Sequence, residues 1–233
     1  MGSEMCIRDR ETARQQMRAQ IVVDGKTSGK LLEENQDAVH GLAWLATYAT
    51  AMQQMQNWAE KLHSDGEFGE IEQLLHQIGT SEYHAQVLGG IPMSQGEFVR
   101  LSDIGISEAA INKYRSADVV ELSNKGNSQD ARMRLVRLMQ DHSAEIITGK
   151  SGLDDELEMI REQFRKFSID KVLPNAHEWH LNDELIPIEI IEELAELGVF
   201  GLTIPEEYGG FGLSKASMAV VSEELARGYI GVG

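Results

Sequence analysis

The stretch GLTIPEEYGGFGL (residues 201–213) determines how the C-terminal part of the chain folds. It lies between two amphipathic helical patterns and combines one proline with four glycines. Glycine tolerates positive φ and lets two backbones approach closely, and proline fixes its own φ. We therefore predict a tight connection between two packed helices. A phosphate-binding loop is the weaker interpretation, because the stretch does not match G-x-G-x-x-G and no predicted strand precedes it.

Helical patterns lie on both sides of this connection. Pro187 stands at a favoured first-turn position of one helix, and Gly198 is its expected cap. Ser214 is the predicted N-cap of a last helix that runs to about Arg227. A longer helix is expected over residues 153–173, which Pro174 kinks without stopping it. The expected buried positions are Leu157, Ile160, Phe164, Phe167, Ile190, Ile191, Leu194 and Leu197.

The N-terminal part repeats apolar residues at steps of three and four, which is typical of helices with one buried face. Helices are expected over residues 11–22, 30–63 (one or two helices), 67–88 and 128–147, with a break at 89–96 and short helices and turns over 97–126. No alternation is long enough to predict a sheet, so the predicted fold class is all-α. The linker predicted at 148–152 divides a helical extension, residues 11–150, from a second helical domain, residues 151–233.

The first ten residues, MGSEMCIRDR, share no pattern with the rest of the chain. Residues 5–10 resemble a translated sequencing-adapter remnant, so residues 1–10 are interpreted as a non-native leader. Cys6, the one cysteine of the sequence, lies within it. A disulfide framework, a zinc cluster or a cysteine nucleophile is therefore not expected in the body of the chain, and a reducing, cytoplasmic location is predicted.

The charge balance is strongly acidic, with 38 acidic and 21 basic side chains and a net charge of −17. Residues 151–233 carry 17 of the acidic and 6 of the basic side chains. Such a surface repels phosphate backbones, so nucleic-acid binding is not expected; it favours solubility or docking of a basic partner. Because no apolar run reaches 18 residues, no membrane-spanning helix is expected, and the N-terminus lacks the apolar segment of a secretory signal.

Several elements within residues 153–233 occur together in an order and spacing that resembles the N-terminal domain of acyl-CoA dehydrogenases. They are Val172-Leu173-Pro174, Leu197-Gly198, Gly201-Leu202, the stretch 205–213, and Ser222-Glu223-Glu224-Leu225-Ala226-Arg227. The helical extension resembles one found in a subset of that family, the methylsuccinyl-CoA dehydrogenases, through GLAWLATY (residues 41–48) and GGIPMSQGE (residues 89–97).

This resemblance implies the N-terminal part of an FAD-dependent enzyme that desaturates a short branched acyl-CoA, with methylsuccinyl-CoA as the candidate substrate. A glutamate base removes the α-proton while the flavin takes the β-hydride, and electron-transferring flavoprotein reoxidises the flavin. Homodimers or homotetramers are usual in the family. The resemblance places the base and most flavin contacts after Gly233, so no catalytic or cofactor-binding residue is assigned here, and the isolated chain is expected to be inactive.

The same resemblance places the acyl pocket just after the Glu-Glu-Leu-Ala-Arg helix, where this chain has Tyr229-Ile230-Gly231-Val232-Gly233. Val232 and Gly233 are therefore the predicted substrate-binding residues. The alternative interpretation is that these two residues serve only helix packing.

Two other functions remain open at this point. The first is a non-catalytic helical interaction or oligomerisation module built on residues 11–150. The second and weaker one is a ferritin-like metal protein, since Glu60-x-x-His63 fits the di-iron pattern once and Asp37-x-x-His40 fits it loosely on the same helical segment.

Two pairs of ionisable residues are interpreted as structural or surface groups and not as functional sites. His177 and His180 stand at i and i+3 without an obvious third ligand, so no metal site is expected. Glu223 and Glu224 are neighbours on a predicted helix and are expected to face solvent rather than to act as an acid–base pair.

Overall fold

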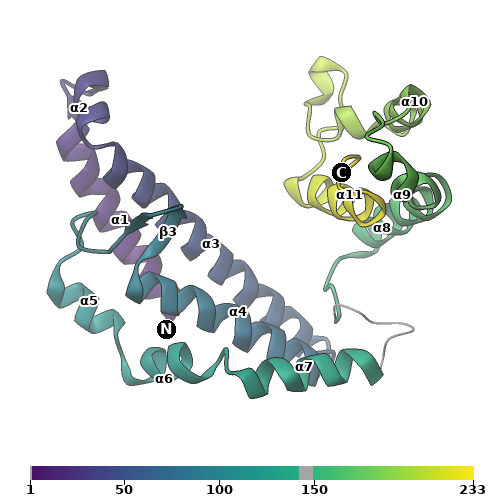
Figure 1. Ribbon diagram of the computed structural model, residues 1–233. Helices are drawn as coiled ribbons and strands as arrows, with labels where there is room; N and C mark the ends of the chain where they lie inside the picture. Colours follow the sequence, from purple (N-terminus) through teal and green to yellow (C-terminus); the bar gives the residue numbers. More distant parts are fainter. Residues whose placement is uncertain (1, 142–148) are drawn as a thin grey trace. The chain divides into compact units, whose positions relative to one another are not determined.

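The computed structural model describes residues 2–141 and 149–233, with side chains described from residue 11 onward (Figure 1). Two compact units divide the chain, Met1–Gly152 and Leu153–Gly233. Helices make up most of both units, which confirms the all-α fold class. The first unit contains α1 (Gly2–Ile21), β1 (Val22–Val23), β2 (Lys26–Thr27), α2 (Gly29–Glu34), α3 (Gln36–Ser64), α4 (Glu70–Gly89), β3 (Ile91–Ser94), β4 (Glu97–Val99), α5 (Glu108–Tyr114), α6 (Ala117–Lys125) and α7 (Gln129–Asp141).

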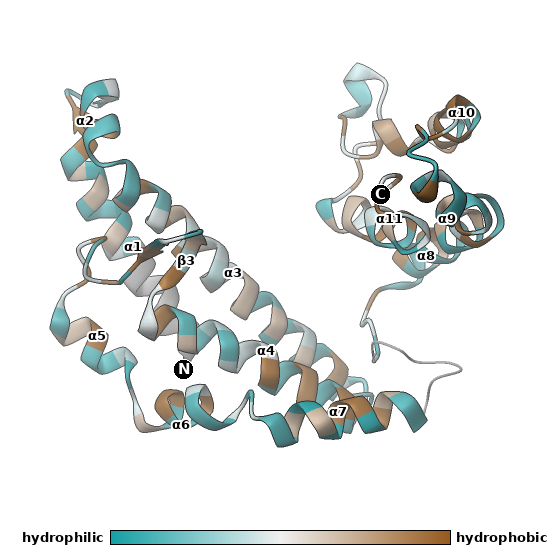
Figure 2. Cartoon of the chain, viewed as in Figure 1, coloured by the Kyte–Doolittle hydropathy of each residue, from teal (hydrophilic) through white to brown (hydrophobic). Residues whose placement is uncertain are grey.

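Helix α3 is the central element of the first unit. Helices α1 and α4 pack along it, α6 and α7 pack on α4, and α5 packs on α1 (Figure 1). Figure 2 shows hydrophilic and hydrophobic residues alternating around α4 and α7, as expected of helices with one buried face. The core residues include Leu45, Tyr48, Ala49, Met52, Val87, Ile91, Val99, Ile104 and Tyr114. The buried face predicted for the helical segment 30–63 is thus confirmed as the inner face of α3.

Two short antiparallel hairpins were not expected from the sequence. Strands β1 and β2 pair across Asp24-Gly25, both at positive φ, and β3 pairs with β4 with Ile91 opposite Val99. The predicted break at residues 89–96 is therefore largely the first strand and turn of the second hairpin. Strands of two to four residues are too short to produce a recognisable alternation.

Some sequence-based boundaries changed in the first unit. The segment 30–63 is two helices, separated at Asn35, whose φ of −122° is not helical. Of the helix predicted over residues 128–147, the described part ends at Asp141; Ile146 and Thr148, which belong to its predicted end and to the linker, lie outside the described residues. Helix α1 begins at Gly2, and the interpretation of residues 1–10 as a leader stays a prediction.

A close contact at Gly41 explains why the stretch 41–48 begins with glycine. The side chain of Val99 from β4 lies directly over this helical glycine, and a Cβ at position 41 would be 2.3 Å from Val99 Cγ2. Leu45, one turn further along α3, joins the same core cluster as Ile91 and Val99. The stretches 41–48 and 89–97 therefore contribute to one helix-to-hairpin contact, which depends on the missing side chain at Gly41.

The second unit contains α8 (Asp155–Phe167), the π-helical turn η1 (Ser168–Val172), α9 (Leu173–Leu181), α10 (Ile188–Glu196), the 3-10 turns η2 (Val199–Gly201) and η3 (Glu206–Tyr208), and α11 (Lys215–Gly228). Its core consists of Phe164, Phe167, Val172, Trp179, Ile190, Leu194, Leu202, Val221 and Leu225. The Ser214 hydroxyl accepts a hydrogen bond from Ser217 N–H, which confirms the predicted N-cap of α11. Gly198 follows α10 at a φ of 79°, which confirms the predicted helix end.

Pro174 produces a wider helical turn without ending the helix. Proline has no N–H, and its ring crowds the carbonyl four residues earlier. Residues 168–172 adopt a π-helical turn, and Leu173 N–H donates to the carbonyl of Ser168. Helical geometry continues through α9 to Leu181, so the predicted continuation past Pro174 is confirmed, while the kink stays a prediction.

The connection 201–213 is a closed turn, as predicted. The N–H groups of residues 210–213 donate to carbonyl oxygens of residues 201–205 at 2.7–3.3 Å. A Cβ at Gly210 would lie 2.1 Å from the Ile204 carbonyl oxygen, so two backbone segments touch here. Since these four N–H groups already have partners within the turn, they are not available to a phosphate.

We predict that Gly41→Ala lowers the free energy of unfolding of the first unit by about 1–3 kcal/mol, because the added methyl group overlaps Val99. The control is Gly29→Ala at the start of α2, where a Cβ meets nothing within 4 Å. Urea unfolding followed by far-UV circular dichroism measures both variants. Equal effects of the two substitutions would contradict the close contact.

Burial disfavours the protonated form of two histidines of α4. His84 is 8% exposed, and its Nδ1 lies 2.5 Å from the Tyr114 hydroxyl of α5. Burial lowers the pKa of His84, and burial likewise lowers the pKa of the half-buried His76. The folded first unit therefore binds protons at these rings less readily than the unfolded chain does.

It follows that stability depends on pH with a definite sign. The contribution of His84 and His76 is fully present above the unfolded pKa of about 6.5 and is lost as pH falls from there through the lowered folded pKa. Urea unfolding at about pH 7.5 and about pH 5.5 should show lower stability at the acidic condition. The double variant His76→Gln/His84→Gln should have a smaller difference between the two conditions, whereas the exposed His177→Gln should leave it unchanged.

Candidate functional site

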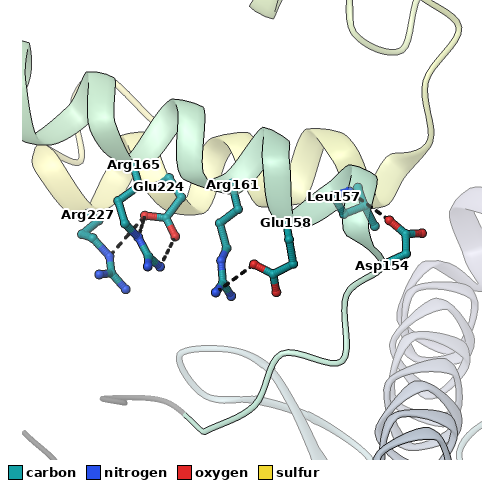
Figure 3. Close-up of polar contacts among 7 residues, drawn as sticks. All are labelled: Asp154, Leu157, Glu158, Arg161, Arg165, Glu224 and Arg227. Carbon is teal, nitrogen blue, oxygen red and sulfur yellow. Dashed lines mark hydrogen bonds and ion pairs between the residues drawn. The ribbon is translucent and has the colours of Figure 1, made fainter. Parts of the chain in front are cut away.

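The most specific polar arrangement of the second unit joins α8 to α11 (Figure 3). Glu224 on α11 is 1% exposed, and Arg165 on α8 donates Nε to its Oε2 at 3.1 Å and Nη2 to its Oε1 at 2.8 Å. Arg227, one turn along α11, adds a contact from Nε to Oε2 at 3.4 Å. Hydrogen bonding to Glu224 raises the pKa of the Arg165 guanidinium above its ordinary value. The result is a bidentate ion pair whose carboxylate is removed from solvent.

This arrangement corrects the expectation that Glu223 and Glu224 both face solvent. Glu223 is exposed, but Glu224 is among the most buried side chains of the unit. Its partner lies 59 residues earlier in the sequence, on a different helix, so no local pattern indicates the pair. Both oxygens of Glu224 accept hydrogen bonds from Arg165, so the ion pair joins α11 to α8.

The C-terminal end of α11 is fixed by two further contacts. A Cβ at Gly228 would be 2.2 Å from Ser168 Oγ and 3.1 Å from Val172 Cγ1, so α11 touches the π-helical turn through a bare backbone. The Tyr229 ring lies 6.2 Å from the Trp179 ring and 6.5 Å from the His180 ring. The five residues 229–233 therefore leave α11 from a well-defined position.

The predicted substrate-binding residues lie in this segment. Val232 is half-buried, packs against the core of the second unit and donates its N–H to the Tyr229 carbonyl at 2.9 Å. Gly233 lies close to the backbone of α11, where a Cβ would be 2.4 Å from Ala226 N. Both residues thus sit where α11 ends, and their assignment to an acyl pocket stays a prediction.

The candidate metal ligands of the sequence are placed as follows. His40 Nε2 accepts a hydrogen bond from Trp44 Nε1 at 3.0 Å, and His63 lies near the end of α3, more than six turns away. His177 and His180 are both exposed, and the His180 ring lies beside the Tyr229 ring with their centroids 6.5 Å apart. Within the described residues, no group of three or more His, Cys, Asp or Glu side chains could hold a metal ion.

Among the residues that the structure describes, no helix combines the length and apolar composition that crossing a membrane requires.

Comparison with known proteins identifies the second unit. Residues 154–233 match the family description "Acyl-CoA dehydrogenase, N-terminal domain". The second unit therefore matches the N-terminal helical domain of that family, as its motifs indicate. At the level of particular proteins, the chain is 57% identical over 223 residues to (2S)-methylsuccinyl-CoA dehydrogenase of Cereibacter sphaeroides, a match that covers 96% of this chain and 40% of that protein.

Other relatives match a shorter part of the chain. Glutaryl-CoA dehydrogenase of Desulfococcus multivorans is 40% identical over 79 residues, which are 33% of this chain and 20% of that protein. Mitochondrial isovaleryl-CoA dehydrogenase of Bos taurus is 35% identical over 78 residues, 33% of this chain and 18% of that protein. The chain spans less than half the length of these curated relatives. The resemblance read from the sequence is confirmed for the domain and for the relative that shares the extension.

The ion pair leads to a test of what holds this domain together. We predict that Glu224→Gln lowers the free energy of unfolding of the second unit by about 1–3 kcal/mol, because it leaves Arg165 without its charged partner and buries an imperfectly satisfied amide. The neighbouring, exposed Glu223→Gln is the matched control and should change stability by less than about 0.5 kcal/mol. Urea unfolding of both variants measures the difference. An equal loss of unfolding free energy in the two variants would show that the Arg165–Glu224 ion pair makes no specific contribution to stability.

Proposed function

We propose that this chain is the N-terminal part of an FAD-dependent acyl-CoA dehydrogenase that acts on a short branched acyl-CoA, with methylsuccinyl-CoA as the favoured substrate. The observation that carries the proposal is the 57% identity over 96% of the chain, which includes the first unit. The glutaryl-CoA and isovaleryl-CoA enzymes match only about a third of the chain. The first unit is thus the feature that favours the methylsuccinyl-CoA enzyme over the other family members.

In this proposal the second unit supplies one wall of the acyl pocket. Residues 229–233 form that wall, with Val232 and Gly233 nearest the substrate. The Arg165–Glu224 ion pair and the contact of Gly228 with the π-helical turn hold the wall in place, since both fix the end of α11. A wall held by packed helices keeps a bound acyl group in a defined position, which is the main contribution of a substrate-positioning element.

The flavin and the base belong, in this proposal, to parts of the parent enzyme outside the matched 40% of the relative. The turn 201–213 does not fit the phosphates of FAD, because the N–H groups of residues 210–213 are used within the turn. We therefore assign no flavin contact and no catalytic residue to the described part of this chain. Electron-transferring flavoprotein as electron acceptor, a homodimeric or homotetrameric assembly and a cytoplasmic location complete the proposal.

A non-catalytic role for the first unit is compatible with this function. The first unit has its own core cluster, which lies entirely within that unit. We propose that it acts as an interaction module of the enzyme.

A chimeric enzyme tests the proposed function. The matched segment of this chain replaces the corresponding 40% of the Cereibacter sphaeroides methylsuccinyl-CoA dehydrogenase. We expect the chimera to purify with bound flavin and to reduce an artificial electron acceptor with methylsuccinyl-CoA, at a kcat/KM within about tenfold of the parent. Glutaryl-CoA and isovaleryl-CoA serve as competing substrates and should react more slowly.

The isolated 233-residue chain is the matched control and should purify without flavin. A folded, flavin-loaded chimera that oxidises none of the three acyl-CoA substrates would contradict the proposed function. A chimera that prefers glutaryl-CoA or isovaleryl-CoA would retain the family but overturn the substrate.

A further inference from the structure

Residues 149–152, Gly-Lys-Ser-Gly, form a segment without regular secondary structure that we name the strap. The sequence predicts a linker over residues 148–152, and in the structure the main chain of the strap is bound by side chains of α3 and α4. Lys150 N–H donates to Glu72 Oε1 at 2.8 Å, and the Lys150 carbonyl accepts a hydrogen bond from Trp58 Nε1 at 3.1 Å. The strap is therefore anchored through backbone groups that every residue type except proline would carry.

Two lysines extend the anchoring. Lys61 Nζ on α3 donates to the Gly152 carbonyl at 2.6 Å. Lys150 Nζ lies 3.4 Å from Glu67 Oε1, in the loop before α4. Contacts from α3, from α4 and from the loop between them thus hold two positions of the strap, Lys150 and its last residue, Gly152.

The two glycines of the strap serve its fit. Gly149 and Gly152 have φ values of 75° and 67°, which side-chain-bearing residues rarely adopt. A Cβ at Gly149 would be 2.9 Å from Glu72 Oε1, and a Cβ at Gly152 would be 3.2 Å from Trp58 Cδ1. Glycine is required here so that the backbone can lie directly on α3 and α4.

Glu72 connects the strap to the start of α4. Its side chain is 6% exposed, and its second oxygen, Oε2, accepts a hydrogen bond from Gly69 N–H at 3.1 Å, which caps the helix. One buried carboxylate therefore serves two backbone donors. Detachment of the strap would leave Oε1 buried without this partner, and that cost favours the bound state.

We propose that the strap remains bound to α3 and α4 in solution, and that the hydrogen bonds of Lys150 to Glu72 and Trp58 hold it there. The chain then leaves the first unit only at Gly152, and Asp154 already caps α8 through its hydrogen bond from Leu157 N–H at 2.9 Å. The connection between the two units is confined to the step from Gly152 to Asp154. Detachment of the strap would add its four residues, up to about 14 Å, to this connection.

This inference is independent of the proposed function, since it uses only contacts within the first unit and the cap of α8. It assigns a conformational role to a segment whose composition alone indicates a passive linker. Substitution of Glu72 by glutamine should weaken the hold on the strap, because a carboxylate accepts hydrogen bonds through two oxygens whereas the amide of glutamine has only one oxygen.

Amide-proton exchange measured by NMR on the full chain tests whether the strap is bound in solution. The Lys150 amide should exchange slowly in the unmodified chain. Glu72→Gln cannot accept from both Gly69 and Lys150, and Trp58→Phe keeps an aromatic ring but removes the Nε1–H donor. Each variant should accelerate exchange at Lys150 by about tenfold. The control is Glu70→Gln, which alters an exposed ion pair with Arg134 in the same first turn of α4 and should change the rate by less than about twofold.

Three outcomes would overturn the proposal. The first is exchange of the Lys150 amide at the rate of an unstructured peptide in the unmodified chain. The second is an unchanged rate in both Glu72→Gln and Trp58→Phe. The third concerns the case in which Glu72→Gln removes protection throughout α4, so that only Trp58→Phe, which leaves the α4 cap intact, is informative. An unchanged exchange rate of the Lys150 amide in Trp58→Phe then contradicts the proposal.

Discussion

A carboxylate removed from water needs hydrogen-bond donors for both of its oxygens. Among the side chains that the structure describes, Glu72 and Glu224 are the buried carboxylates, one in each unit. Glu224 receives the fork of Arg165 across 59 residues of sequence, and Glu72 receives the N–H of Lys150 across 78. In a chain with a net charge of −17, most carboxylates need only water. These two instead specify which distant segments meet, and the helix pairing of the second unit and the course of the strap follow from them.

Close backbone contact is the second constraint, and it gives physical content to the family motifs. Gly41 admits Val99, and Gly210 admits the Ile204 carbonyl. At each site a methyl group would require something to move. Packed interiors tolerate such overlap poorly, which explains why the recognisable stretches contain glycine at these places. The resemblance to acyl-CoA dehydrogenases thus rests on contacts between segments, although it was read from a linear pattern.

Local features were predicted correctly from the sequence because their causes lie within a few residues. The cap at Ser214, the helix end at Gly198 and the continuation past Pro174 each depend on one residue and its nearest backbone groups. The hairpins were missed because their strands are shorter than the pattern that would indicate them. The solvent-facing assignment of Glu224 was wrong because its partner is remote, and burial on a helix cannot be inferred from an adjacent acidic residue.

The sequence by itself determined the all-α class, the helical periodicity, the resemblance of the second unit to acyl-CoA dehydrogenases and that of the first unit to a methylsuccinyl-CoA enzyme, since composition, spacing and motif order are linear properties. Only the tertiary structure decided that Glu224 is a buried ion-pair partner, that Gly41 lies under a hairpin, and that the Gly-Lys-Ser-Gly segment is bound. The physical reason is the same in each case. Burial and hydrogen bonding depend on which groups lie nearby in space, and for these residues the decisive groups lie some 60 to 90 positions away along the chain.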